Sequence, residues 1–211
     1  MKHAQKLITV LVLIIIMTLG LTGCGGTIGD MDIEAGESAI YIQEDGKVSY
    51  AFSEKFDKKY YDEDSLEEAI NTEVEEYNSG SRASVKNAIE VDSFKVKDKV
   101  ATAVLDFETA YDFLSYVKYY NNIESDKFYI GLIEENSDCK IKGDFVSADK
   151  KEKVTEKEIK KMKDSNILIV SEAYKVQLDE DVKYISTNCS IDEDGIITTG
   201  KAEDGLSYIV Y

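Results

Sequence analysis

Carboxylates are the only acid–base side chains that this chain of 211 residues holds in large number. It has 42 Asp and Glu against 25 Lys and Arg, and its single histidine is His3. Without other histidines, Ser-His-Asp and Cys-His catalytic arrangements and His-containing zinc sites cannot form. Two carboxylates about 5–10 Å apart across a cleft can still hydrolyse a glycosidic bond. A carboxylate-based hydrolase such as a glycosidase is therefore the enzyme class left open, although the chain has no Trp to stack on a sugar.

Two other patterns resemble catalytic motifs but depart from them. The segment 195–201 fits G-x-x-x-x-G-K of a phosphate-binding loop, yet Ala202 stands where magnesium binding needs a hydroxyl. The segment is also strand-like, whereas a phosphate-binding loop leads into a helix. Ser115 and Lys118 have the S-x-x-K spacing of penicillin-binding proteins, and 186–188 resembles their second motif, but the sequence lacks the Lys-Thr-Gly third motif. We interpret both patterns as coincidences.

The acidic run Asp192-Glu193-Asp194-Gly195 is similar to part of a calcium-binding loop. Aligned as an EF-hand, it would require Glu at the twelfth position, where the chain has Lys201. A hairpin turn explains the run better. We therefore expect no metal site and no cofactor.

Two cysteines, Cys139 and Cys189, could pair if the protein is exported. Cys189 alternates with apolar residues and is predicted to be buried, whereas Cys139 follows a polar run and is predicted to be exposed. A disulfide needs Cα atoms within about 7 Å of each other. Sequence spacing does not establish that distance, so the disulfide and the free thiols are both open alternatives.

Aromatic side chains gather on a predicted helix over 110–121. If Phe113 faces the core, Tyr116 and Tyr119 project outward. Exposed tyrosines can stack on a sugar or anchor a protein contact. Packing beneath neighbouring loops is the alternative for both residues.

The first 24 residues carry the most specific pattern in the chain. Lys2 and Lys6 precede a largely apolar run over 7–21, which ends in Leu21-Thr22-Gly23-Cys24. The run is shorter than the ~20 residues of a membrane-spanning helix and fits a signal segment. The four residues at its end resemble the lipobox of bacterial lipoprotein precursors. The resemblance implies that signal peptidase recognises Leu21, Thr22 and Gly23, cleaves before Cys24, and leaves a diacylglyceryl group on the Cys24 sulfur.

Lipidation at Cys24 predicts where the protein is found. Two or three acyl chains, such as palmitate, give stable anchoring, which places the chain on the outer face of the cytoplasmic membrane. Removal of Lys2 and Lys6 with the signal leaves 23 basic side chains against 42 acidic ones. That acidity repels phosphate backbones, so we expect no nucleic-acid partner.

The predicted domain organisation follows from this pattern and from composition. Residues 1–23 are a lipoprotein signal peptide, and 24–38, with four glycines, form a flexible tether. Residues 39–211 form one extracytoplasmic domain, with a split into two subdomains near 134–154 as the alternative.

Local patterns predict the elements of that domain. A hairpin over 39–53 turns at Asp45-Gly46. Two further strands cover 85–96 and 99–107, and another covers 128–133. A buried strand begins at 167 and continues to 178. Three more strands lie near 182–191, 195–200 and 206–211.

Three helices are predicted between the strands. The first covers 62–78, with Leu66, Ile70, Val74 and Tyr77 inside and with Asp64 and Glu67 as a capping box. The second is the helix over 110–121, capped by Thr109. The third opens at Thr155 with Glu158. The fold class is therefore α+β, with a mostly antiparallel sheet or sheets of about eight to ten strands and about three short helices.

These observations together predict a lipid-anchored, acidic, extracytoplasmic lipoprotein. It resembles the small uncharacterised lipoproteins of Gram-positive anaerobes in its layout. We expect a non-catalytic binding or accessory module with a protein or glycan partner, held to the membrane by a diacylglyceryl anchor. The alternative is the carboxylate-based surface hydrolase.

Overall fold

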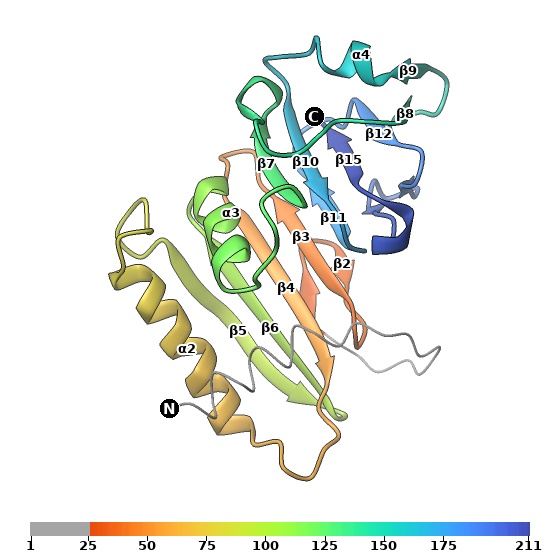
Figure 1. Ribbon diagram of the computed structural model, residues 1–211. Helices are drawn as coiled ribbons and strands as arrows, with labels where there is room; N and C mark the ends of the chain where they lie inside the picture. The colour runs from red at the N-terminus through yellow and green to blue at the C-terminus, as the bar shows by residue number, and fades with distance from the viewer. Residues whose placement is uncertain (1–25) are drawn as a thin grey trace.

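The computed structural model describes residues 26–211, which fold into an α+β structure (Figure 1). These residues hold three α-helices and 15 strands in three sheets, and most strand pairs are antiparallel. The predicted class is confirmed, but the expected eight to ten strands are too few. Several strands are only two residues long, and such short ladders leave no alternating pattern in a sequence.

A seven-stranded sheet has the order β13-β14-β11-β3-β4-β6-β5. Its strands are β3 (Ser38–Ile42), β4 (Val48–Lys55), β5 (Ile89–Lys97), β6 (Val100–Phe107), β11 (Lys175–Leu178), β13 (Ser190–Ile191) and β14 (Ile197–Thr198). The β3–β4 hairpin is confirmed, with Gly46 at φ 86° in its turn. Only the β11–β3 pair within this sheet is parallel.

A six-stranded sheet has the order β7-β10-β15-β12-β8-β9 and lies beyond one end of the first sheet (Figure 1). Its strands are β7 (Phe128–Leu132), β8 (Asp144–Ser147), β9 (Lys153–Thr155), β10 (Asn166–Val170), β12 (Tyr184–Ser186) and β15 (Ser207–Val210). The buried strand β10 lies between β7 and β15, as predicted for a central strand. Its predicted continuation to 178 is wrong, because β11 leaves this sheet and pairs with β3. The segment 134–154 supplies β8 and the start of β9.

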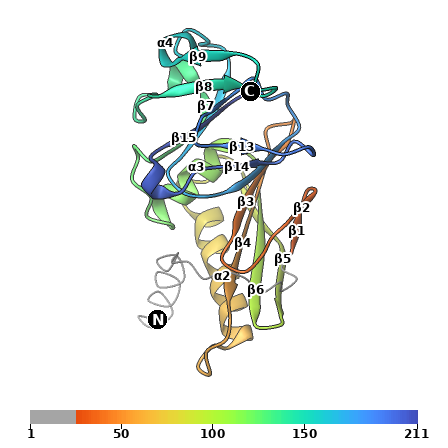
Figure 2. The ribbon, with the colours of Figure 1, turned by 90° about the vertical axis from the view of Figure 1, so that its right-hand side faces the viewer.

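The long helices cover one face of the seven-stranded sheet (Figure 2). Helix α2 (Glu63–Ser79) buries the four predicted residues Leu66, Ile70, Val74 and Tyr77. Its N-cap is Asp62, not the predicted Asp64, because the Asp62 side chain accepts from the Ser65 amide at 2.9 Å.

The other two helices begin where predicted. Helix α3 (Ala110–Tyr119) is capped by Thr109, and α4 (Glu156–Ile159) has the predicted Thr155–Glu158 capping box. Phe113 of α3 packs between the sheets, with ring-centroid distances of 5.5 Å to Tyr50 and to Phe128. One core cluster therefore contains side chains from both large sheets.

The opposite face of the seven-stranded sheet carries a small hairpin of β1 (Thr27–Ile28) and β2 (Met31–Asp32). Ile28, Met31 and Ile33 are buried there against Ala51 and Val104. The predicted tether over 24–38 is therefore wrong from residue 26 onward, and the fold begins near Thr27, not Ala39. The few apolar side chains between the glycines suffice because the small residues of the sheet leave room for them.

Candidate functional site

The predicted lipidation motif, Leu21 to Cys24, lies outside the described residues 26–211, as does the signal peptide. Among the residues that are described, no helix has both the length and the hydropathy of a membrane span.

The two tyrosines predicted to form a contact surface have different environments. Tyr119 is exposed, with the Arg82 guanidinium 3.6 Å from its ring centroid. The prediction for Tyr116 is wrong, because this side chain is only 4% exposed. Its hydroxyl donates to the Glu73 carboxylate, and its ring stacks on Tyr120 at 5.1 Å. Helix α2 packs against this side of α3, so α3 is buried on two sides.

Both described cysteines are free thiols, so the disulfide alternative is not realised. The predicted order of exposure is also wrong, because Cys139 is the more buried of the two. Cys139 is 5% exposed because the Asn136 side chain bonds to both its backbone N–H and its C=O, which folds the polar run over it. Burial raises the pKa of the Cys139 thiol to about 11. Cys189 is half-buried, with Sγ 3.4 Å from the Ser186 hydroxyl.

The segments that resemble catalytic and calcium-binding motifs in the sequence form turns, strands and ion pairs of the fold. Gly195, at φ 81°, follows a turn in which Asp192 Oδ1 accepts from the amides of Asp194 and Ile196 at 3.1 and 2.9 Å. This confirms the hairpin turn, and the segment continues into β14 rather than into an α-helix. Lys118 pairs with Asp138 at 3.5 Å. Within residues 26–211 no three His, Cys, Asp or Glu side chains form a group suited to a metal ion.

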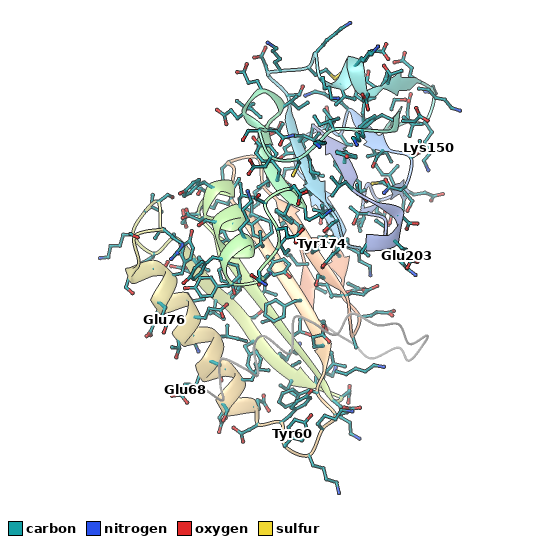
Figure 3. All side chains as sticks on the ribbon, viewed as in Figure 1. Tyr60, Glu68, Glu76, Lys150, Tyr174 and Glu203 are labelled. Carbon is teal, nitrogen blue, oxygen red and sulfur yellow. The ribbon has the colours of Figure 1, made fainter. Side chains whose placement is uncertain are left out.

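A polar pocket of about 440 Å³ lies at one end of the six-stranded sheet. Four separate segments line it: the residues before β7, the loop into β8, the end of β12, and the 3-10 helix η2 (Ala202–Asp204) with β15. Glu203, labelled in Figure 3, marks the position of η2. The lining includes Asp126, Lys127, Asp138, Lys140, Lys142, Gly143, Asp144, Ser186, Thr187, Asn188, Asp204, Leu206 and Tyr208.

The floor of this pocket is held by internal hydrogen bonds. Ser186 and Tyr208 are each 4% exposed. The Ser186 hydroxyl donates to Asn188 Oδ1 at 2.6 Å and accepts from the Tyr208 amide at 2.9 Å. The Tyr208 hydroxyl donates to the Lys140 carbonyl at 2.8 Å. These groups are already satisfied, so the floor is rigid and poorly suited to supply a nucleophile.

The walls of the pocket carry the groups that are free to meet a ligand. The ammonium groups of Lys127, Lys140 and Lys142 form no ion pair with another described residue, and neither do the carboxylates of Asp126 and Asp144. The pocket therefore offers charges of both signs within a largely acidic protein. Such a lining fits a polar or zwitterionic ligand better than an apolar one.

A second arrangement concerns carboxylates on the helix side of the seven-stranded sheet. Burial raises the pKa of Glu54 to about 7 and also raises the pKa of Glu172. Both groups influence Tyr50, whose pKa rises to about 12, chiefly through burial and then through these carboxylates. Tyr174, labelled in Figure 3, lies in the same region, and its pKa also rises, chiefly through burial and then through Tyr50 and Glu172. Two acids with perturbed pKa values beside buried hydroxyls are the arrangement from which acid–base chemistry would be built.

Sequence reasoning missed the pocket because its lining comes from four separate segments between residues 126 and 208. No family model matches this chain, and neither the curated proteins nor the solved structures contain a match to it.

Proposed function

We propose that this chain is a lipid-anchored extracytoplasmic lipoprotein whose folded part is a non-catalytic binding or accessory module. The observation that supports binding is the mixed-charge pocket: its floor is internally satisfied, and its wall lysines and aspartates have charges available. The pattern at Leu21 to Cys24 supports the anchor. The proposed ligand is a glycan or a peptide segment of a protein partner, because both offer hydroxyl, amide and charged groups at the scale of the pocket.

Site-specific photo-crosslinking in intact cells tests the binding role. A photoreactive residue replaces Thr187 at the pocket, and a control chain carries the same residue at Lys157 on α4. Both positions are exposed. We expect a reproducible adduct from position 187 that Lys127→Ala or Lys142→Ala weakens. Equal adducts from both positions would show that the pocket is not the binding site.

The anchor is tested by Cys24→Ala. The parent protein should fractionate with membranes and carry the mass of a diacylglyceryl group, and the variant should lose that mass and keep its uncleaved signal. If the parent protein lacks the mass of the diacylglyceryl group, the lipoprotein proposal is wrong.

The second candidate is the carboxylate-based hydrolase, favoured by the raised pKa values of Glu54 and Glu172. Hydrolysis of a glycan panel would then fall at least ~100-fold in Glu54→Gln or Glu172→Gln, as expected for loss of a general acid or base. Glu90→Gln, an exposed substitution on β5, is the matched control. If the parent chain hydrolyses none of the panel, the binding module remains the better proposal.

A further inference from the structure

Lysines are concentrated at one end of the seven-stranded sheet, although the protein as a whole is acidic. The segments 55–61 (KFDKKYY) and 95–99 (KVKDK) together contain six lysines and two aspartates, and four further acids, Glu54 and residues 62–64, flank the first segment. The full chain has the opposite balance, with 42 acidic and 25 basic side chains.

These two segments lie side by side. Val100 of β6 pairs with Lys55 on one side and with Lys97 on the other. The Phe56 amide also donates to the Lys99 carbonyl at 2.7 Å. They form the end of the molecule farthest from the six-stranded sheet, marked by Tyr60 in Figure 3.

An aromatic side chain projects from the same end. Tyr60 is 72% exposed, the largest exposed fraction among the exposed large hydrophobic residues in the described part of the chain. Its ring meets that of Tyr61 at 5.0 Å, and Tyr61 stacks on Phe56 at 4.9 Å. The packed rings of Tyr61 and Phe56 therefore support the exposed Tyr60 side chain. Tyrosine beside lysine is the combination that favours the headgroup region of a bilayer.

The N-terminal segment joins the sheet close to these lysines. Gly26 lies so near Thr102 that a Cβ on it would be 2.9 Å from Thr102 Cγ2. Thr102 pairs with Lys95 in β5, and directly opposed residues share a face of a sheet. Lys97 alternates with Val96 and lies on that face too. Gly26 is the second residue after Cys24 in the sequence, and two residues of chain span at most about 7 Å.

Most lysine ammonium groups at this end form no ion pair with a described residue. Among residues 26–211, Lys59, Lys95, Lys97 and Lys99 take part in none of the ion pairs, and Lys58 pairs only with its neighbour Asp57, at 3.4 Å. The acidic helix α2, with Glu68 and Glu76 labelled in Figure 3, begins at this end with Glu63 and Asp64 and covers the opposite face of the sheet from Lys95 and Lys97.

We propose that the lysine–tyrosine end, formed by Lys58, Lys59, Tyr60, Lys95, Lys97 and Lys99, docks on the anionic headgroups of the membrane that carries the anchor. This inference rests on the proposed attachment of the chain at Cys24. Lysines within a Debye length of an anionic surface are attracted to it, and an anchor at the same end holds them there. Docking turns the six-stranded sheet and its pocket away from the bilayer, toward a ligand or partner.

The absence of Trp from the chain gives a direct test. The full chain with Tyr60→Trp is reconstituted into phosphatidylcholine vesicles with and without phosphatidylglycerol, each containing brominated lipid as a quencher. Tyr111→Trp is the matched control, because Tyr111 is 61% exposed on α3, away from this end. We expect the Trp at position 60 to lose most of its emission in the anionic vesicles, to lose less in the neutral ones, and to recover in high salt. The Trp at position 111 should show none of these changes.

Charge variants identify the lysines as the cause. Lys95→Glu with Lys97→Glu and Lys99→Glu should abolish the quenching of the Trp at position 60, and Lys59→Glu alone should weaken it. The same number of reversals at Lys157, Lys161 and Lys163, near α4 at the far end, should leave it unchanged. Equal quenching at positions 60 and 111, or quenching that survives the β5–β6 triple variant, would overturn the docking proposal.

The mass of the reconstituted protein separates the two proposals. Quenching at position 60 in a chain that carries no diacylglyceryl group would retain docking and remove the lipid anchor. A lipidated chain without that quenching would retain the lipid anchor and overturn the docking proposal.

Discussion

At the scale of single residues, the most concentrated hydrogen bonding is at the Asp112 carboxylate. This side chain is fully buried in the first turn of α3. It accepts from the Ser84 amide at 2.9 Å, from the Thr109 hydroxyl at 2.6 Å and from the Tyr77 hydroxyl at 3.1 Å. It therefore ties the start of α3 to α2 and to the loop that follows α2.

Asp112→Ala should be strongly destabilising. The substitution leaves several buried donors without an acceptor, and we expect a loss of about 2–4 kcal/mol in the free energy of unfolding. Urea unfolding measures the loss. Asp126→Ala, on an exposed carboxylate, should change stability by less than ~0.5 kcal/mol. Equal losses from the two variants would contradict the role assigned to Asp112.

Glu54 predicts a pH dependence of stability. Its pKa is raised to about 7 by burial, above its value in the unfolded chain. Between pH 4.5 and 7 the native state therefore binds a proton that the unfolded state has released, and stability falls as pH rises. Because the group is partly exposed, solvent screening reduces the effect to ~1 kcal/mol. Glu54→Gln should match the parent at pH 4.5 and exceed its stability by that amount at pH 8. A constant difference at both pH values in urea unfolding would exclude this titration.

The cysteines should differ in reactivity toward a thiol reagent in the native state. Cys139 is buried and its pKa is raised to about 11, so little thiolate forms at pH 8. Cys189 is less buried and should react first. Cys189→Ser should abolish the faster reaction of the described thiols, and Cys139→Ser should preserve it. Complete reaction of both in urea provides the reference.

At the scale of elements, sequence patterns predicted those features of helices and turns that depend on residues close together in the chain. The inner face of α2, the Thr109 cap and the β3–β4 turn each depend on residues within about four positions of one another. The Tyr116 prediction failed because it took one core face for α3, whereas α2 approaches a second face. The Asp64 cap failed for a smaller reason, because Asp62 and Asp64 are both capping residues and the geometry decides between them.

The β1–β2 hairpin gives a prediction at the same scale. Met31 is fully buried in a segment whose composition indicated a tether. Met31→Ala should lower the free energy of unfolding by about 2–3 kcal/mol, through lost transfer energy and the cavity left behind. Glu34→Ala, on an exposed side chain of the same segment, is the control. If both variants unfolded like the parent in urea, residues 26–38 would be a tether after all.

At the scale of the whole molecule, the sequence predicted the α+β class but not the site. The periodic spacing of apolar residues predicts which side chains are buried. It does not predict which segments meet around the pocket, namely 126–127, 138–144, 186–188 and 204–208. That meeting depends on the strand order β7-β10-β15-β12-β8, in which pairs between strands distant in sequence decide the arrangement. The lysine–tyrosine end was missed for the same reason: its two segments are about 35 residues apart and become neighbours only through β4–β6 pairing.

The overall charge predicts how the molecule responds to salt. The six ion pairs of the described residues join partly exposed side chains and contribute little. Repulsion among the excess carboxylates, many of them on α2, opposes folding over longer distances. Screening this repulsion by raising NaCl from ~10 to ~200 mM should raise Tm by about 2–4 °C. Glu68→Gln with Glu76→Gln should be more stable than the parent at low salt and respond less to added salt. A fall in Tm with salt would show instead that local attraction between opposite charges outweighs the repulsion, and the acidic surface would then stabilise the fold.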